Sequence, residues 1–141
     1  MEIIFMNLDE IITHWKKSDI KLNNASSIDE ILELEKILNF KSPSSFKYLY
    51  SRINGFKDYD SNEHIFTIYP LERIQLEYFE NQNINFIPFC DYLINSHQIG
   101  FSKLDSKIYI NYNTENNFND LVANTFEESL VEIINNSDKI Y

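Results

Sequence analysis

The segment Ile31–Gly55, with the sequence ILELEKILNFKSPSSFKYLYSRING, contains the clearest fold signals in the chain. Apolar residues recur every three or four positions on each side of its Ser-Pro pair, which is typical of two amphipathic helices. Asn39 can adopt the left-handed conformation that ends the first of them. We expect Ser42 to cap the second helix, because Pro43 is tolerated in a first turn, where its missing N–H has no helical partner. Gly55 then ends this helix, since glycine accepts a positive φ.

Outside this segment, capping boxes predict where three helices begin. In a capping box, the first residue's side chain and a Glu three positions later satisfy each other's backbone N–H groups. The three pairs are Asn7 with Glu10, Ser27 with Glu30, and Thr125 with Glu128. Apolar stripes at helical spacing follow each pair, so we predict helices over residues 8–17, 28–38 and 126–134.

The hydrophobic period changes in the middle of the chain, where β-branched and aromatic residues indicate strands. The predicted strands are His64–Tyr69, Phe86–Ile94, His97–Leu104 and Ile108–Tyr112, with a short helix at Leu71–Phe79. Residues 113–120 are predicted to be a polar loop and residues 135–141 a tail. Helices that are segregated from a run of strands indicate an α+β fold. We expect one domain over residues 1–141, with a mostly antiparallel sheet of about four to five strands packed against N-terminal helices and a C-terminal helix.

The composition is acidic, with 22 Asp and Glu residues against 12 Lys and Arg and a formal charge of −10. Such a chain is repelled by nucleic acid and by anionic membranes and attracts basic surfaces, although acidity also serves solubility alone. No apolar run is long enough to span a membrane, and no basic segment precedes the apolar start as in a signal peptide. Cys90 is the only cysteine, which excludes an internal disulfide. We therefore expect a cytoplasmic protein.

Signatures of catalysis are missing from the sequence. Gly55 and Gly100 are the only glycines, so a glycine-rich phosphate-binding loop is excluded. The three histidines, His14, His64 and His97, have no second ligand at a spacing typical of metal sites. Cys90 precedes Asp91, whereas a reactive thiolate needs an electropositive setting. We expect a protein without enzymatic activity, cofactor or bound metal.

One set of residues goes beyond these patterns. Its members are Glu35, Pro43, Phe46, Leu49, Asn54 and Gly55, followed in order by Ile87-Pro88-Phe89, Lys107–Ile110 and Asn124–Leu130. In this order they resemble the signature of the SUKH superfamily over residues 27–136. The chain departs from it in two places: Ser42 replaces the usual leucine before the proline, and the glycine-rich hairpin between later strands is reduced to Gly100.

The resemblance implies an α+β domain that binds other proteins. Bacterial members are often immunity proteins that neutralise a toxin domain, frequently a nuclease, and fungal relatives are interaction hubs in cell-wall regulation. We therefore expect a non-enzymatic immunity protein whose partner is a basic toxin or effector domain. The alternative is a regulatory or scaffolding module with an endogenous partner.

The expected contact surface lies within residues 56–80, where aromatic residues alternate with acids. Nucleic-acid-binding proteins place Lys and Arg between aromatic residues, so this is the inverse pattern and suits a partner with basic side chains. The candidate partner-binding residues are Asp58, Tyr59, Asp60, Glu63, Glu77, Tyr78 and Glu80.

Overall fold

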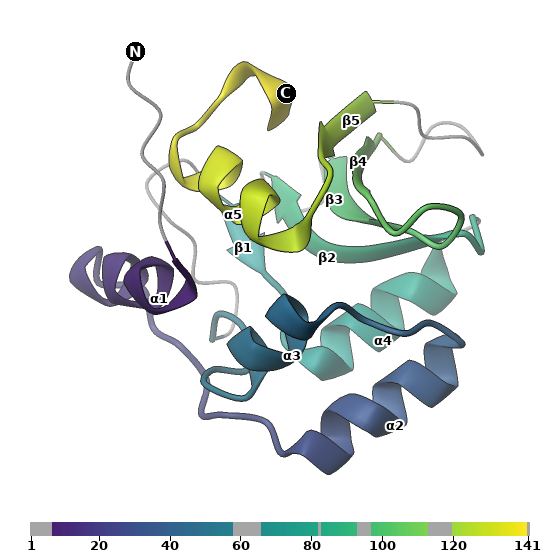
Figure 1. Ribbon diagram of the computed structural model, residues 1–141, viewed down its shortest axis with the longest axis horizontal. Helices are drawn as coiled ribbons and strands as arrows, with labels where there is room; N and C mark the ends of the chain where they lie inside the picture. The colour runs from purple at the N-terminus through teal and green to yellow at the C-terminus, as the bar shows by residue number, and fades with distance from the viewer. Residues whose placement is uncertain (1–6, 58–65, 82, 93–96, 113–119, 141) are drawn as a thin grey trace.

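The computed structural model describes residues 7–57, 66–81, 83–92, 97–112 and 120–140 (Figure 1). The helices are α1 (Leu8–Lys17), α2 (Ile28–Leu38), α3 (Ser44–Tyr50), α4 (Leu71–Glu80) and α5 (Phe126–Ile134), with a 3₁₀ turn, η1 (Asp138–Ile140). The strands are β1 (Phe66–Ile68), β2 (Phe86–Tyr92), β3 (His97–Ser102), β4 (Ile108–Asn111) and β5 (Asp120–Ala123). Within the described residues they form one antiparallel sheet in the order β1-β2-β3-β4-β5. The predicted α+β fold is confirmed.

The predicted helix ends agree with the structure at most positions. Both N-terminal capping boxes are formed, because Asn7 and Ser27 each accept the backbone N–H of the Glu three residues later, and that Glu returns the bond. Thr125 accepts the backbone N–H of Glu128, which is one of the two hydrogen bonds of the capping box predicted there. Asn39 ends α2 with φ 51°.

Gly55 has a positive φ of 70°, but the prediction that it ends α3 is wrong, because this helix ends at Tyr50 with Ser51 as its C-cap. The glycine is needed instead where the chain passes the backbone of Tyr69 and Pro70, since a Cβ atom there would lie 2.5 Å from both.

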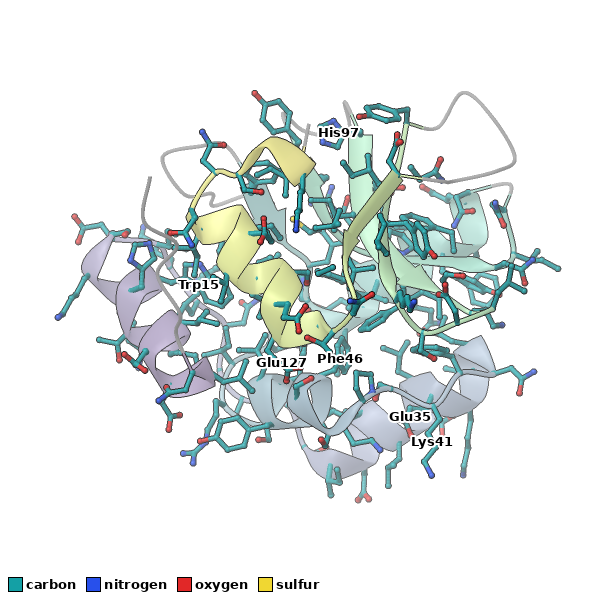
Figure 2. The ribbon with its side chains drawn as sticks, turned by 45° about the horizontal axis from the view of Figure 1, so that its top comes forward. Trp15, Glu35, Lys41, Phe46, His97 and Glu127 are labelled. Carbon is teal, nitrogen blue, oxygen red and sulfur yellow. The ribbon has the colours of Figure 1, made fainter. Side chains whose placement is uncertain are left out.

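The predicted cap of α3 is wrong. The helix begins at Ser44, and Pro43 occupies the cap position without a side-chain hydrogen bond. Ser42 instead donates its backbone N–H to Glu35 Oε2 at 2.8 Å, and its hydroxyl donates to the same oxygen. Lys47 Nζ lies 3.4 Å from that oxygen, and Figure 2 shows Glu35 on the helix below Phe46. The carboxylate of α2 therefore competes for the serine and ties α2 to the start of α3.

Glu35 is accordingly a structural residue. Its partial burial alone would raise the pKa of the carboxyl, but hydrogen bonds from Ser42 and the charge of Lys47 outweigh burial and lower this pKa below 4.5. A lowered pKa in the folded state stabilises the fold above the unfolded-state value. That stabilisation is lost as the pH falls through the folded-state value.

Replacing Glu35 with alanine is expected to lower the free energy of unfolding by about 2 kcal/mol, because charge-assisted hydrogen bonds to Ser42 are lost. Chemical denaturation at neutral pH measures the change, and the difference from the unsubstituted protein should shrink below about pH 4. Glu33→Ala, at an exposed position of the same helix, is the control and should stay within about 0.5 kcal/mol. Equal losses for both variants would contradict this role for Glu35.

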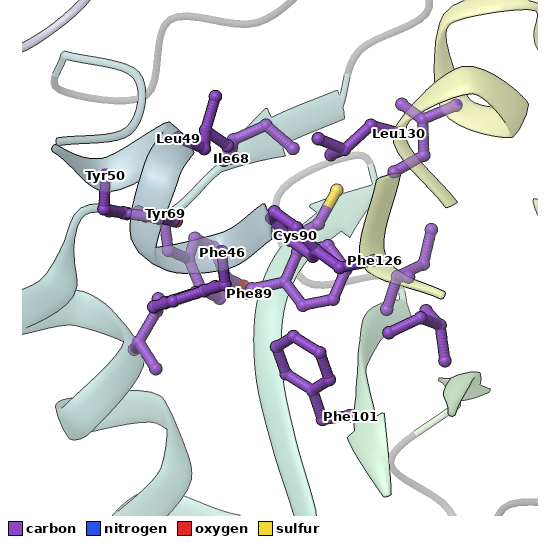
Figure 3. Packing of buried hydrophobic residues seen from close by; sticks show 14 of the residues in the cluster. Phe46, Leu49, Tyr50, Ile68, Tyr69, Phe89, Cys90, Phe101, Phe126 and Leu130 are labelled. Carbon is purple, nitrogen blue, oxygen red and sulfur yellow. The ribbon is translucent and has the colours of Figure 1, made fainter. Parts of the chain in front are cut away.

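The apolar face of the sheet forms the centre of the core. Cross-strand rows place Ile87, Phe101 and Ile108 side by side, and Cys90, Ile99 and Ile110 next to them. Rings from α3 and α5 close over these rows: Phe101 lies with its centroid 5.9 Å from Phe46 and 5.6 Å from Phe126 (Figure 3). The core thus joins the segment that decides the fold to the middle of the sheet.

Gly100 marks a close approach within the sheet. A Cβ atom at this position of β3 would lie 2.2 Å from the carbonyl oxygen of Ile87 and 2.7 Å from the Cα of Pro88 in β2. Both neighbours are backbone atoms, which move only if the strands separate. The one glycine that remains in this hairpin region is therefore at a position where a side chain does not fit.

Two elements were not predicted from the sequence. Strand β5 pairs with β4 and begins at Asp120, the last residue of the predicted loop, and η1 lies within the predicted tail. Ile140 of η1 is fully buried, and its carbonyl oxygen lies 2.9 Å from Nε2 of His97. The His97 ring also stacks on Tyr92, with a 5.1 Å centroid distance. A histidine at the start of β3 therefore holds the C-terminal turn against the sheet.

This arrangement predicts a pH dependence. Burial lowers the pKa of His97 below 6.5, and the hydrogen bond with Ile140 only partly offsets it. The unfolded state therefore binds a proton at a higher pH than the folded state. The contribution of neutral His97 to the free energy of unfolding is fully present above the pKa of the unfolded state, near 6.5. This contribution is lost as the pH falls through the lower pKa of His97 in the folded state. Thermal unfolding of His97→Gln should show a weaker decline between about pH 7 and pH 5 than the unsubstituted protein, and equal declines would contradict the assignment.

Candidate protein-docking surface

Helix α4 is apolar on two sides. Its inner side packs against the core through Leu71 and Ile74, which are both buried. On its outer side, Leu76 and Phe79 expose 55% and 60% of their surface. A surface helix of a globular domain ordinarily has one apolar stripe and a polar remainder. The second apolar side is the kind of feature that marks an interaction site.

A polar cluster holds α4 against β2 and β3. The Tyr69 hydroxyl donates to Oδ2 of Asp91 at 2.9 Å, and Arg73 Nη2 lies 3.1 Å from the same oxygen. Glu77 accepts a 2.8 Å hydrogen bond from Gln98 Nε2 and lies 3.5 Å from Arg73 Nε. Asp91 is only 1% exposed, so the cluster is an internal anchor. These bonds fix which side of α4 faces outward.

An open groove of about 470 Å³ separates α4 from α2, and the two helices lie next to each other in Figure 1. Its described lining includes four acidic side chains and no basic one: Asp29, Glu30, Glu33 and Glu72. Ile37 also lines it and is 38% exposed. The groove therefore combines negative charge with exposed apolar surface.

The two helices carry much of the protein's charge. Together α2 and α4 hold seven acidic and two basic residues, a balance of −5, which is half of the formal charge of −10. The two basic residues are Lys36 on α2 and Arg73 on α4, and Arg73 is already paired with Glu77 and Asp91. Negative potential is therefore concentrated on this side of the molecule.

A second groove, of about 590 Å³, borders the outer side of α4. Leu76 and Phe79 line it together with Phe56 and Pro70, so much of its wall is apolar. Glu72 and Gln75 line both grooves, so the two lie next to each other on α4. We refer to Glu33, Ile37, Glu72, Leu76 and Phe79 as the α2–α4 surface.

The residues predicted from the sequence to bind a partner fall into two groups. Asp58, Tyr59, Asp60 and Glu63 lie outside the residues that the structure describes. Glu77, Tyr78 and Glu80 belong to α4. Their role in binding a partner stays a prediction.

The three residues on α4 have different surroundings. Glu77 bonds to Gln98 and Arg73, and the Tyr78 hydroxyl donates to the Ile84 carbonyl at 2.9 Å and accepts from Lys103 Nζ at 3.2 Å. Glu80 is exposed. The predicted helix thus carries exposed surface, but two of the three side chains chosen on it already bond within the protein.

The α2–α4 surface itself was not identified from the sequence. Leu76 and Phe79 are separated by three positions, which places them on one side of a helix. That side lies away from the stripe formed by Leu71, Ile74 and Tyr78, so two apolar stripes on one short helix were the available signal. The contribution of Glu33 and Ile37 had no such signal, because it depends on the packing of α2 against α4.

The groups considered for catalysis lie elsewhere. Burial, followed by the nearby charge of Asp91, raises the pKa of the Cys90 thiol well above 9.0, which disfavours a thiolate at neutral pH. His97 holds the C-terminal turn. In the described part of the chain, no three His, Cys, Asp or Glu side chains lie close enough together to hold a metal ion, and no helix there is long and apolar enough to cross a membrane.

Comparison with known proteins identifies the family of the chain. The model of the SMI1 / KNR4 family (SUKH-1) matches residues 25–132. This range includes α2 to β5 and most of α5, and therefore the whole α2–α4 surface. No curated protein matches the chain.

Proposed function

Because the chain belongs to the SMI1 / KNR4 family (SUKH-1), we propose that it is a non-enzymatic immunity protein that binds and neutralises a cognate bacterial toxin domain. Bacterial members of the SUKH superfamily often have this role, which supports the proposal. The α2–α4 surface is the single observation that carries it furthest, because it offers exposed apolar residues within an acidic setting. An interface of that kind suits a partner with basic and apolar side chains.

A nuclease toxin is the partner class that this surface fits best. A nuclease presents basic groups to the phosphates of its substrate. An acidic protein that covers those groups competes directly with nucleic acid. Opposite charges also steer the two proteins together, which speeds capture of the toxin.

The proposal is tested by co-expressing the chain with the product of the adjacent reading frame. We expect a stable complex and relief of that product's toxicity. A neighbouring product that is toxic yet neither bound nor neutralised would contradict the proposal for that partner. Binding to an endogenous protein, without protection, would indicate the regulatory or scaffolding alternative instead.

The complex is expected to depend on salt. The association rate constant should fall at least about tenfold between about 0.05 M and about 0.5 M NaCl, because dissolved ions screen charge–charge steering. Stopped-flow fluorescence measures this rate, with the dissociation rate as internal comparison, since that rate should change much less. An association rate that is indifferent to salt would indicate an apolar interface without electrostatic steering.

A further inference from the structure

The outer side of α4 presents exposed apolar side chains next to acidic ones, and this combination favours one kind of partner. Leu76 and Phe79 line an apolar groove and are more than half exposed, so no described element of the chain covers this side of the helix. Beside it, across Glu72 and Gln75, the groove between α2 and α4 carries four acidic side chains and no basic side chain among its described lining residues. Apolar anchors and uncompensated negative charge therefore lie next to each other.

We propose that the α2–α4 surface binds a segment of the partner protein in which lysine or arginine side chains flank an apolar side chain. This inference rests on the proposed partner-binding function and names the chemistry of the contact. The apolar side chain packs against Leu76 and Phe79. The basic side chains enter the groove and pair with Glu33 and Glu72.

Charge complementarity distinguishes this occupant from the others. A second copy of the chain would bring the same acids face to face with Glu33 and Glu72, and like charges across an interface oppose association. Nucleic acid and anionic lipid carry the same sign of charge and are repelled for the same reason. A purely apolar segment would fill the groove beside Leu76 and Phe79 but would leave the acids of the second groove without partners.

The geometry of α4 supports a preformed site. The buried cluster of Tyr69, Arg73 and Asp91 fixes the rotation of the helix, so Leu76 and Phe79 do not need to be reoriented on binding. On the other side of the groove, Glu35 ties α2 to the start of α3. A surface that is already ordered loses little conformational entropy when a partner binds.

The test uses a synthetic peptide in which arginine alternates with leucine, and fluorescence anisotropy with the full-length protein at low salt. Phe79→Ala and Glu33→Lys should each weaken binding about tenfold or more, as expected for residues at the centre of an interface. The matched controls are Leu104→Ala, at a residue 77% exposed in the turn between β3 and β4, and Glu128→Lys, at an exposed acid of α5. Both should stay within about twofold.

Three outcomes would overturn the inference. They are the absence of binding to the unsubstituted protein, equal losses in the surface and control variants, and equal affinity for a peptide in which serine replaces every leucine. Circular dichroism of Phe79→Ala should show an unchanged thermal midpoint, since Phe79 is exposed, so that weaker binding reports on the surface and not on the fold.

The same variants separate this inference from the proposed function. If the adjacent gene product binds the unsubstituted protein and the Phe79→Ala and Glu33→Lys variants equally well, the immunity function stands and the docking assignment fails. If that product does not bind while the peptide shows the expected pattern, the docking assignment stands and the proposed partner is wrong.

Discussion

Phe101→Ala is expected to lower the free energy of unfolding by about 3–5 kcal/mol, the cost of removing a buried aromatic ring. Phe101 is 1% exposed, and its ring contacts those of Phe40, Phe46, Phe89 and Phe126 at centroid distances from 5.2 to 5.9 Å. Truncation leaves a cavity where β2, β3, α3 and α5 meet. The surrounding rings belong to separate elements, so they are unable to close the gap without moving whole strands or helices.

Chemical denaturation followed by tryptophan fluorescence measures this loss, since Trp15 is a buried reporter. Phe79→Ala is the matched control, because it makes the same chemical change at a 60% exposed position and should stay within about 0.5 kcal/mol. Similar losses in the two variants would mean that the ring cluster is not the centre of the core. The control also provides the folded protein that the binding experiment requires.

Asp91→Ala is expected to lower the free energy of unfolding by about 3 kcal/mol, because it leaves the buried end of Arg73 without its carboxylate. The loss lies at the low end of the range for a broken buried ion pair, since Glu77 remains beside Arg73. The hydroxyl of Tyr69 also loses its acceptor. Burial and the charge of Asp91 both raise the pKa of Tyr69, so this hydroxyl stays protonated and needs an acceptor.

Hydrogen exchange tests where the damage from Asp91→Ala is located. Amides of α4 should lose the most protection, because the cluster that holds this helix against the sheet is lost, while amides of β4 should lose less. Asp120→Ala is the control, since this acid is exposed on β5 and should affect stability by no more than about 0.5 kcal/mol. Uniform loss of protection across the sheet would show that Asp91 supports the whole fold and not α4 in particular.

The sequence predicted the helix ends that depend on contacts between residues close together in the chain. Asn7 and Ser27 cap helices through a Glu three positions later, and Asn39 ends α2 through its own backbone conformation. Gly55 has the expected positive φ but does not end α3, because that helix already stops at Tyr50. Ser42 was misassigned because its partner is Glu35, seven positions away on another helix. A rule that considers only neighbouring residues does not include a carboxylate on another helix that accepts the hydrogen bonds of the serine.

The missed elements depend in the same way on distant contacts. Strand β5 is four residues long, and only two of them are buried. It therefore forms through its backbone pairing with β4. The burial of Ile140 follows from the position of His97, 43 residues earlier. For the candidate site, the sequence selected α4 but not its outer side, since Glu77 and Tyr78 are engaged by Gln98 and Lys103 from the sheet and its turn.

The exposed pair Leu76 and Phe79 has a consequence for the protein before it meets a partner. Apolar side chains that face water promote self-association of free molecules. Glu72 lines the same groove and Glu80 follows Phe79 on the helix, so every copy carries negative charge at this patch and like charges oppose contact between copies. The acidic residues thus oppose aggregation of the free protein. Substitution of these acids by neutral residues is therefore expected to promote self-association of the free protein.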